Sequence, residues 1–310
     1  MNKKYSLIGI IFVFGVIGIS FLYFNPNSQE IQSREIQSGE IQSGEIQSGE
    51  IPPIMKIKEL VPLNTTSLFK IFVYADDYTI LSDGSKNWSS FKLEKNPINQ
   101  DLYDQISSDG KTAVIYPVFT AAAYSEPGFY TFYRGECNPE FNGDLYQEDD
   151  CLTVKIKESY DIQFSSSGVA ANVFWLLEYD ILTDIDVHKN PELLLNYEKI
   201  ILLHNEYVTS IMFDAITSHP KVIYLYPNAL YAEVDFDEEL REITLVRGHN
   251  YPDIEIRNGF DWEYDNSPDE YDVGCEDMKF SRINNGWMLN CYPENIIHKD
   301  KSLLEKIRGF

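Results

Sequence analysis

The stretch KIILLHNEYVTSIMFDAITSHPKVIYLY, residues 199–226, contains two short apolar runs separated by a segment with helical character. Lys199–Leu203 and Val222–Tyr226 are continuously apolar, which is typical of parallel strands buried on both faces. Between them, Thr209 is a candidate N-cap for a helix over Thr209–Ser218. A strand, a helix and a strand in this order predict a right-handed crossover connection and therefore a parallel sheet.

The same alternation extends toward the N-terminus. Further elements are expected as strands at Leu68–Tyr74, Thr112–Phe119, Leu152–Ile156 and Ile181–Ile185 and as a helix at Val169–Leu177. We therefore predict an α/β domain over residues 54–247, with a mainly parallel sheet flanked by helices. Alternating runs then predict antiparallel strands at Ala232–Val234 and Glu242–Arg247, and residues 248–310 are expected to form a β-rich C-terminal extension.

Polar and aromatic side chains follow three of the predicted strands. These strand ends carry Tyr124, His204, Asn205, Glu206, Tyr207, Asn228 and Tyr231. In an open parallel sheet, ligands bind in the crevice outside the carboxyl ends of the strands. We therefore expect these side chains to line one crevice, with Asn228, Tyr207 and Tyr231 contacting a bound molecule.

His204 and Glu206 are the candidate chemical groups of that crevice. A histidine at a buried strand end can act as a general base, since its usual pKa is about 6.5. Glu206 lies two residues on and shares its face if the strand continues, so the pair can ligate a metal or polarise a water. The alternative is that both side chains bond loop backbone. The other histidines, His188, His219, His249 and His298, lie in predicted loops without a partner pattern.

Several common site motifs are absent from the sequence. No cysteine or serine occupies a nucleophile elbow of the Gly-x-Cys-x-Gly or Gly-x-Ser-x-Gly type. There is also no Gly-x-Gly-x-x-Gly fingerprint and no P-loop. The sequence therefore favours neither covalent acyl transfer nor nucleotide binding.

The N-terminal residues predict a membrane anchor. Lys3 and Lys4 precede an unbroken apolar run over residues 5–24, and about 20 apolar residues suffice to cross the hydrocarbon core as a helix. The lysines favour a cytoplasmic location for residues 1–4, with the body exported. A cleaved signal peptide is the alternative, but the run is long for one and lacks a small-x-small cleavage site. Both interpretations place the body outside the cytoplasm, and the first predicts a single-pass cell-membrane protein.

Residues 25–53 have the composition of a flexible stalk. They contain the repeat Glu-Ile-Gln-Ser-Gly, whose period of five matches neither a helix nor a strand. Pro52 and Pro53 close this spacer. The 310-residue chain carries a formal net charge of −24, which argues against nucleic acid as a partner because the phosphate backbone would be repelled.

The chain has four cysteines, an even number that suggests disulfides in an exported protein. Four cysteines allow three connectivities. We expect the local pairing of Cys137 with Cys151 and of Cys275 with Cys291, which closes two short loops. A zinc site is the alternative, but the cysteines lack the close spacing that such sites show.

The strand-end motifs, in their order along the chain, resemble the C-terminal region of N,N-dimethylformamidase large subunits. The similarity covers about residues 112–247, less than half of the chain, and is carried by Thr120-x-x-Ala123-Tyr124, Tyr160, Thr183-Asp184, His204-Asn205-Glu206-Tyr207, Asn228-Ala229-Leu230-Tyr231 and Arg247. The resemblance implies a fold of the class I glutamine-amidotransferase type, which is flavodoxin-like.

In that family an iron is held by two tyrosines and a glutamate. The resemblance implies that Tyr124, Tyr160 and Glu206 would hold iron here, with His204 beside the metal and Asn228 lining the pocket. A set of phenolates and a carboxylate suits a hard ferric ion that polarises an amide carbonyl. This sequence departs from the family at Pro227 and Ala229, where glycines are usual, and it lacks both the lectin-like N-terminal portion and a match for the later catalytic acid.

Three hypotheses about function follow. A surface domain that binds a small molecule or a cell-surface partner explains the tether, the acidity and the absent nucleophile. A metal-dependent hydrolase of amide C–N bonds explains the convergence of Tyr124, His204, Glu206 and Asn228. A structural envelope component is supported only by the repeat stalk. A hydrolase must keep Tyr124, His204 and Glu206 within mutual hydrogen-bond or ligand reach, whereas a binding domain need not.

Overall fold

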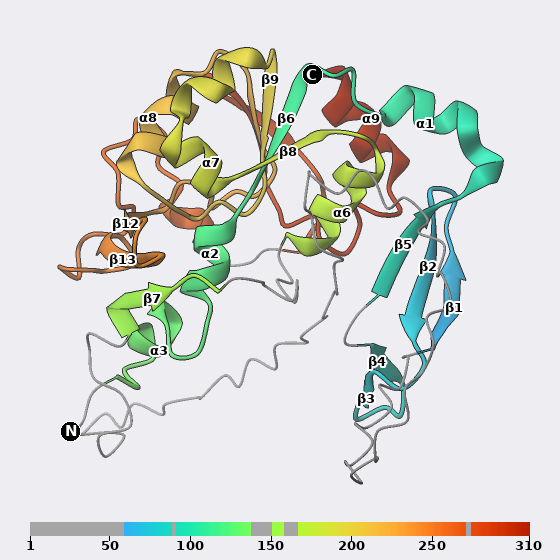
Figure 1. The fold of residues 1–310 in the computed structure, drawn as a ribbon, viewed down its shortest axis with the longest axis horizontal. Helices are drawn as coiled ribbons and strands as arrows, with labels where there is room; N and C mark the ends of the chain where they lie inside the picture. The colour runs from blue at the N-terminus through green and yellow to red at the C-terminus, as the bar shows by residue number, and fades with distance from the viewer. Residues whose placement is uncertain (1–58, 89–90, 138–150, 158–166, 271–273) are drawn as a thin grey trace, which may run out of the picture.

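The computed structural model describes residues 59–88, 91–137, 151–157, 167–270 and 274–310 (Figure 1). The expected anchor over residues 5–24, the stalk over 25–53 and the candidate ligand Tyr160 lie outside these ranges. Within them, no helix is both long and apolar enough to cross a membrane.

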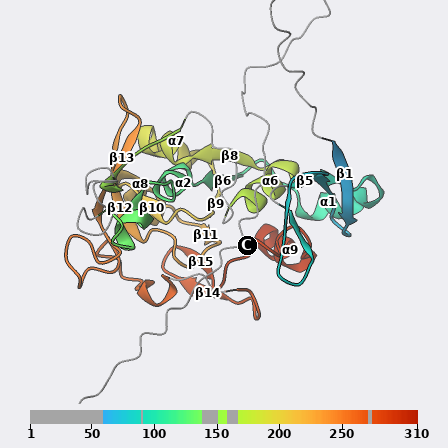
Figure 2. The same ribbon diagram turned by 90° about the horizontal axis from the view of Figure 1, so that it is seen from below.

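A six-stranded sheet forms the centre of the molecule, and the strands predicted at Thr112–Phe119, Ile181–Ile185, Lys199–Leu203 and Val222–Tyr226 contribute to it. The strands predicted at Leu68–Tyr74 and Leu152–Ile156 form as well, but they pair antiparallel in two other sheets, so their assignment to the parallel sheet is wrong. The strands of the central sheet are β6 (Thr112–Tyr116), β8 (Asp180–Thr183), β9 (Lys199–Leu202), β11 (Val222–Tyr224), β14 (Phe280–Ile283) and β15 (Gly286–Leu289). They are arranged in the order β8-β6-β9-β11-β15-β14, which Figure 2 shows from top to bottom. The first five strands are parallel and only β14 is antiparallel. The prediction of an α/β fold with a mainly parallel sheet is therefore confirmed.

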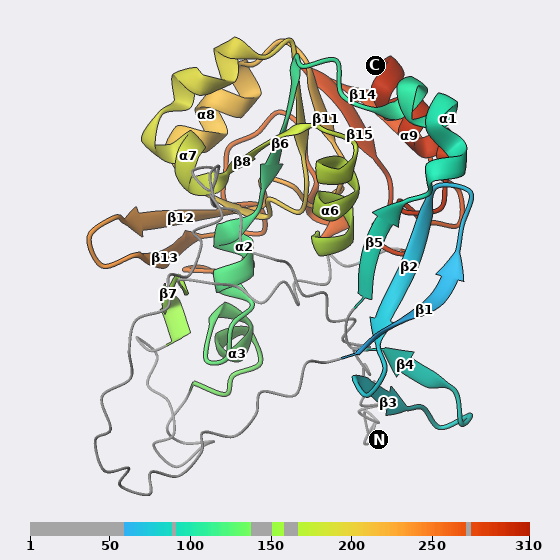
Figure 3. The same ribbon diagram turned by 45° about the vertical axis from the view of Figure 1, so that its right-hand side comes forward.

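Helices cover both faces of this sheet (Figures 1 and 3). One face packs against α2 (Val118–Ala123), α7 (Asp184–Lys189) and α8 (Ser210–Ser218), and the other against α1 (Gln100–Ile106), α6 (Gly168–Leu176) and α9 (Lys301–Gly309). Successive residues of β9 alternate between the two cores, since Ile200 and Leu202 belong to the first and Ile201 to the second. Because both faces are buried, the strand is continuously apolar.

Caps and a proline set the element boundaries. The Thr209 side chain accepts a hydrogen bond from the backbone of Met212, so the predicted N-cap is confirmed. The strand predicted at Thr112–Phe119 is wrong beyond Tyr116, because Pro117 follows, lacks an N–H for the ladder, and is succeeded by α2. The strand predicted at Ile181–Ile185 also ends early, at Thr183, because the Thr183 side chain caps the helix α7 that follows.

A second, four-stranded sheet packs beside α2. Its strands are β7 (Thr153–Lys155), β10 (Tyr207–Val208), β12 (Ala232–Asp237) and β13 (Glu242–Arg247), in the order β10-β12-β13-β7. The predicted antiparallel pairing of the two runs after Tyr231 is confirmed in β12 and β13. This sheet begins where the loop after β9 ends, so it holds that loop in place.

The remaining elements complete the described chain. They are the strands β1 (Leu60–Thr65), β2 (Phe69–Tyr74), β3 (Tyr78–Ile80), β4 (Lys86–Trp88) and β5 (Phe91–Lys95), the helix α3 (Phe129–Tyr133), and the 3-10 turns η1 (Pro97–Asn99), η2 (Pro191–Asn196) and η3 (Ser267–Asp269). The sheet β1-β2-β5 contributes Phe69, Ile71 and Leu93 to the core under α1 and α6. From residue 248 onward, the chain supplies the hairpin β14–β15 to the central sheet and the helix α9 to its face.

Both expected disulfides are present. Cys137 is bonded to Cys151, and Cys275 to Cys291, with Cα atoms 6.4 and 5.0 Å apart. The local pairing predicted from the sequence is therefore confirmed. The first bond joins the end of α3 to the start of β7, and the second fastens the hairpin β14–β15.

Candidate functional site

The loop after β9 brings its side chains to the point where the sheet reverses direction. Along the chain, β6 comes first and β8 second, so the order β8-β6-β9 places the reversal between β6 and β9. Such a reversal opens the crevice in which open parallel sheets bind ligands. The Thr120 hydroxyl, in α2 after β6, accepts hydrogen bonds from the backbones of Glu206 (3.1 Å) and Tyr207 (3.3 Å). The ends of β6 and β9 are thereby joined.

Two tyrosines and one glutamate form the centre of this site. The Tyr124 hydroxyl donates to Glu206 Oε2 at 2.9 Å, and the Tyr130 hydroxyl donates to the Tyr124 oxygen at 2.8 Å. The Tyr130 oxygen also lies 3.3 Å from Glu206 Oε1. Glu206 has no exposed surface, whereas the two tyrosines are partly exposed. The tyrosine rings, stacked with centroids 4.2 Å apart, therefore lie between the carboxylate and the solvent.

His249 joins Glu206 to a second carboxylate. Its Nε2 lies 2.6 Å from Glu206 Oε1, and its Nδ1 lies 3.1 Å from Glu270 Oε1. Both partners are carboxylates, so both ring nitrogens donate and the ring is an imidazolium. Two of the residues predicted to contact a bound molecule lie beside this ring. The Tyr207 ring stacks on it with centroids 5.6 Å apart, and the Tyr231 hydroxyl donates to its partner Glu270.

His204 lies on the other side of Glu206. Its Nε2 is 3.4 Å from Glu206 Oε2 and 2.9 Å from the Asn228 side-chain nitrogen. Both His204 and Asn228 are almost fully buried, and the Asn228 side-chain oxygen has no hydrogen-bond partner among the described residues. An unsatisfied acceptor of this kind is costly to bury, which marks a place where a bound group would be favourable.

Asp184 ties three strand ends together behind the site. It follows β8, and its carboxyl oxygens accept from the backbone of Phe119 at 2.7 Å and from the Asn205 side chain at 2.5 Å. Burial raises the pKa of Asp184 to about 8. The partners lie after β6 and β9, so this carboxyl group fixes the relative positions of the three strand ends.

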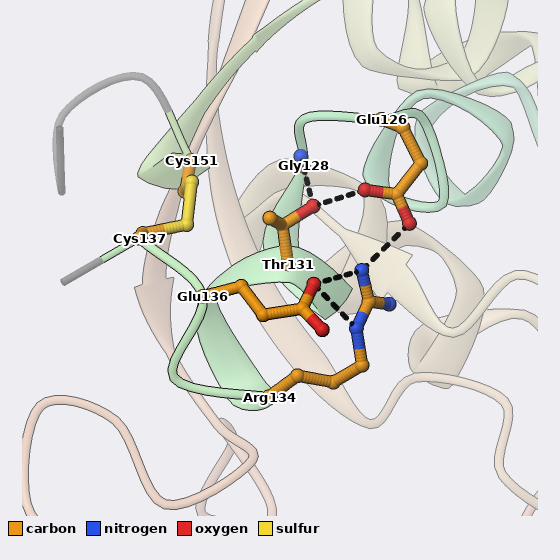
Figure 4. The surroundings of a disulfide bond; sticks show 7 residues. All are labelled: Glu126, Gly128, Thr131, Arg134, Glu136, Cys137 and Cys151. Carbon is orange, nitrogen blue, oxygen red and sulfur yellow. Dashed lines mark hydrogen bonds and ion pairs between the residues drawn. A yellow bond between two sulfur atoms is a disulfide. The ribbon is translucent and has the colours of Figure 1, made fainter. Parts of the chain in front are cut away.

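The short helix α3 positions Tyr130, and local contacts hold it in place (Figure 4). Five residues are too few for a stable isolated helix. Thr131 accepts from the backbone of Gly128 and donates to Glu126, while Arg134 bonds both Glu126 and Glu136. The Cys137–Cys151 bond follows directly. A side chain on Gly128 would meet the Ser125 carbonyl oxygen at 2.3 Å, so the chain can approach itself this closely only at a glycine.

The two histidines that flank Glu206 are held in opposite protonation states. Burial lowers the pKa of His204, although the Glu206 charge opposes it, so His204 is neutral near pH 7. Burial also disfavours a charge on His249, but its hydrogen bonds to Glu206 and Glu270 prevail and raise its pKa to about 9. Burial alone would raise the pKa of Glu206, yet the contact with His249 holds it below the usual value.

The tyrosines are neutral in this arrangement. Burial, and then the negative charge of Glu206, raise the pKa of Tyr124 and of Tyr130 well above the usual value. The hydroxyls therefore act as hydrogen-bond donors at neutral pH, and they lose their protons only to a strongly Lewis-acidic partner.

The structure thus brings together Tyr124, His204, Glu206 and Asn228, as expected from the strand ends. Tyr160 lies outside the described residues. The sequence-based reasoning missed Tyr130, His249 and Glu270. The expectation that His249 lies in a loop is met, since it lies in the turn after β13, but the expectation that it has no partner is wrong, because it meets Glu206 and Glu270 there. The aromatic run Phe129–Tyr133 gave a signal for Tyr130, but its spacing does not reveal which ring faces the carboxylate.

The oxygen atoms of Tyr124, Tyr130 and Glu206 fit a hard cation. The two phenol oxygens lie 2.8 Å apart, that of Tyr124 lies 2.9 Å from Glu206 Oε2, and that of Tyr130 lies 3.3 Å from Glu206 Oε1. An octahedral cation with bonds of about 2.0–2.1 Å holds neighbouring oxygens about 3 Å apart. Over the described ranges no group of three or more His, Cys, Asp and Glu side chains is arranged to hold a metal ion. A metal set at Glu206 therefore requires the phenol oxygens.

No family model matches the chain, and no curated protein sequence matches it.

Proposed function

We propose that this chain is a membrane-tethered, extracytoplasmic hydrolase of amide C–N bonds, built on a dimethylformamidase-like scaffold of the glutamine-amidotransferase type. The observation that carries the proposal is the set of Tyr124, Tyr130 and Glu206, in which the carboxylate is buried and flanked by His204 and His249. The mutual reach of Tyr124, His204 and Glu206 is what a hydrolytic site requires and a binding surface does not.

The strand order supports the flavodoxin-like part of this proposal. Taken along the chain, the five parallel strands have the order 2-1-3-4-5, which is the flavodoxin-like arrangement. The candidate site lies at the reversal point of that order. Fold alone does not fix activity, so the proposal depends on the side chains at that point.

Each side chain has a distinct part in the proposed reaction. A ferric ion held by Tyr124, Tyr130 and Glu206 would supply Lewis acidity to the carbonyl oxygen of an amide. Neutral His204 would accept a proton from the attacking water at Nε2, where this proton would replace the hydrogen bond that the Asn228 amide donates. His249, charged at neutral pH, donates a proton to the departing amine nitrogen. Two groups of opposite protonation state around one carboxylate give the acid and the base that amide hydrolysis needs.

The position of the chain relative to the membrane belongs to the same proposal. The apolar run over residues 5–24 would anchor the protein, and residues 25–53 would lift the body away from the bilayer. The two disulfides agree with an oxidising compartment. Substrates would then be small amides that reach the cell surface.

A surface domain that binds a small molecule or a cell-surface partner is the second candidate. The burial of Glu206, His204 and Asn228 favours this candidate, because these groups have almost no surface that a substrate could contact. Two cavities lined by described residues, of about 420 and 210 Å³, also lie away from this cluster. A binding domain would use the partly exposed tyrosine rings without any turnover.

Hydrolysis of simple amides distinguishes the two candidates. The full-length chain, purified in detergent without chelator and then supplied with ferric ion, is incubated with formamides and acetamides while amine release is measured. We expect amine release by the native chain and a loss of at least about 100-fold for His204→Gln and for Glu206→Gln, because a positioned acid–base group contributes about 10²–10⁴-fold.

His219→Gln is the matched control. His219 is also buried, but at the far end of the strands, where its Nε2 donates to the Tyr197 carbonyl and its Nδ1 accepts from the Lys221 backbone N–H. Its replacement should leave the rate unchanged. Absence of amine release from every amide by an iron-loaded, folded chain would favour the binding domain instead.

A further inference from the structure

A second cluster of charged side chains lies at the opposite edge of the central sheet, where β6, β9 and β11 begin. It borders a cavity of about 210 Å³. The charged residues that line it are Asp109, Lys111, Glu198, Lys199, Lys221 and Arg308. Four basic side chains thus face two carboxylates, in a chain whose formal net charge is −24. A local excess of positive charge in so acidic a protein calls for an explanation.

Both carboxylates of the cluster are already paired. Arg308 contacts the Asp109 carboxylate at 2.9 Å, and Lys111 contacts the Glu198 carboxylate at 2.5 Å. Within the described residues, neither Lys199 nor Lys221 has a carboxylate within ion-pair distance. Two ammonium groups are therefore left beside the cavity with no described side-chain carboxylate in ion-pair contact.

Lys199 is held so that one donor remains available. Its side chain is almost fully buried, with 4% of the residue exposed. The ammonium donates to the backbone carbonyls of Ile307 (2.8 Å) and Arg308 (3.2 Å) in the last turn of α9. An ammonium has three donors, and these two bonds leave the third without a partner among the described residues. Burial and then the nearby charge of Lys221 lower the pKa of Lys199 to about 8, so the two cations are close enough to repel.

We propose that this cavity binds a small oxyanion, of the size of inorganic phosphate, between Lys199 and Lys221. An oxyanion would accept the free donor of Lys199 and neutralise two like charges, and hydrogen bonds between charged partners are the strong ones. The volume is below the roughly 300 Å³ at which sites for drug-sized molecules begin, which suits a small ligand. Capping of α9 explains the orientation of Lys199, but it leaves the charge of Lys221 unexplained.

Binding of an anion in this cavity would also affect how α9 packs against the central sheet. Lys199 reaches from the start of β9 to the last turn of that helix, and Arg308 in the same turn pairs with Asp109. An anion in the cavity would reduce the repulsion among these cations and thereby strengthen the contact between the helix and the sheet. Binding should therefore raise the melting temperature.

Calorimetric titration of inorganic phosphate into the full-length protein at constant ionic strength tests this inference. We expect saturable binding and a rise in melting temperature for the native chain. Lys221→Gln should weaken phosphate binding about tenfold or more, as expected for loss of a hydrogen bond between charged partners. Lys221 is only half-buried, so this variant should fold, whereas Lys199→Met serves as a second test if its unfolding transition stays cooperative.

Lys70→Gln is the control of equal charge change, because Lys70 lies on β2 and does not line the cavity. It should bind phosphate as the native chain does. Equal affinity in Lys221→Gln and the native chain would mean an adventitious ion only and overturn the proposal. A native chain that shows no saturable binding at millimolar phosphate would also overturn it.

Discussion

Glu206 is fully buried, and its carboxylate is stabilised by side chains rather than by water. His249 lies 2.6 Å from one oxygen, while Tyr124 and His204 lie 2.9 and 3.4 Å from the other. Removing one partner of a buried ion pair costs about 3–5 kcal/mol, because the remaining charge has no compensation. A chain retains such an arrangement more readily for chemistry than for stability.

The protonation of His249 predicts how stability depends on pH. Its pKa is about 9 in the folded chain, against about 6.5 when unfolded. Between these values the folded state binds a proton that the unfolded state releases. The stabilisation is therefore complete below about pH 6.5 and is lost as the pH rises through about 9, a change of about 3 kcal/mol.

Urea denaturation at pH 6 and at pH 9.5, compared between the native chain and Glu270→Gln, measures this contribution. The variant loses one of the two carboxylates that hold the imidazolium, so its unfolding free energy should fall less steeply. Asp184 and Lys199, both with pKa values of about 8, titrate in the same interval. They do so in both proteins and cancel in the comparison. Identical slopes would contradict the assignment of His249 as an imidazolium.

At the level of single residues, the sequence allowed His204, Glu206 and Asn228 to be predicted, and the structure brings them together. Each follows directly on a buried strand, so its position depends only on local pattern and on the rule for parallel sheets. The position of His249 beside Glu206 depends instead on the pairing of β10 with β12 and of β12 with β13. Pairing between strands distant in the sequence leaves no local trace, which is why His249 was missed.

At the level of elements, the four-stranded sheet assembles the site as much as the central sheet does. Glu206 immediately precedes β10, Tyr231 precedes β12, and His249 follows β13 by one residue. Gly248, between β13 and His249, has a φ of 125°, a backbone conformation that residues with a side chain rarely adopt. The disulfide between Cys137, which follows α3, and Cys151, which precedes the fourth strand β7, joins these two elements. One small sheet therefore fixes the carboxylate, the imidazolium and the tyrosine helix relative to one another.

This arrangement predicts unequal effects of the two disulfides. Replacing Cys137 and Cys151 by serine should lower the free energy of unfolding by about 3 kcal/mol, the value expected for a loop of this length. It should also increase hydrogen exchange in α3, because five helical residues cannot persist alone. The paired control replaces Cys275 and Cys291, whose loop is of similar length. That variant should lose similar stability yet keep slow exchange in α3, and equal exchange in both would count against this role of the first bond.

Element boundaries were predictable wherever a local cap defines them. The helix over Ser210–Ser218 begins after Thr209 as predicted, and the disulfide pairs follow from their short separation. The apolar run from Thr112 to Phe119 was different, since its hydrophobicity continues unchanged from β6 into α2. Buried strands and buried helices cannot be separated by apolar content alone.

At the level of the whole molecule, the described residues form an α/β body with a proposed site at each of two opposite edges of one sheet. The carboxyl edge carries Tyr124, Tyr130 and the buried Glu206, and the amino edge carries the lysine cavity. The apolar run before the body predicts that the whole unit is tethered. Fractionation of cells that express the full chain should place it in the membrane pellet after alkaline washing.

Removal of residues 5–24 together with a separate export signal should release the body in soluble form. Protease added to intact cells should digest the native chain, because the body is expected outside. Full protection from protease, or recovery of the unmodified chain in the soluble fraction, would contradict a tethered extracytoplasmic body.

The central claim is that Tyr124, Tyr130 and Glu206 hold a hard metal ion, and visible absorption tests it most directly. The full-length chain is loaded with ferric ion, and iron per chain is quantified together with the colour of the iron–phenolate bond. We predict nearly one iron per chain and a visible band that weakens and shifts in both Tyr124→Phe and Tyr130→Phe. Tyr224→Phe is the control, because Tyr224 lies in β11 and its buried hydroxyl bonds Asn285 away from the site. This variant should keep the band unchanged. A folded native chain that takes up no iron, or a band unaffected by either of the first two variants, would contradict the claim.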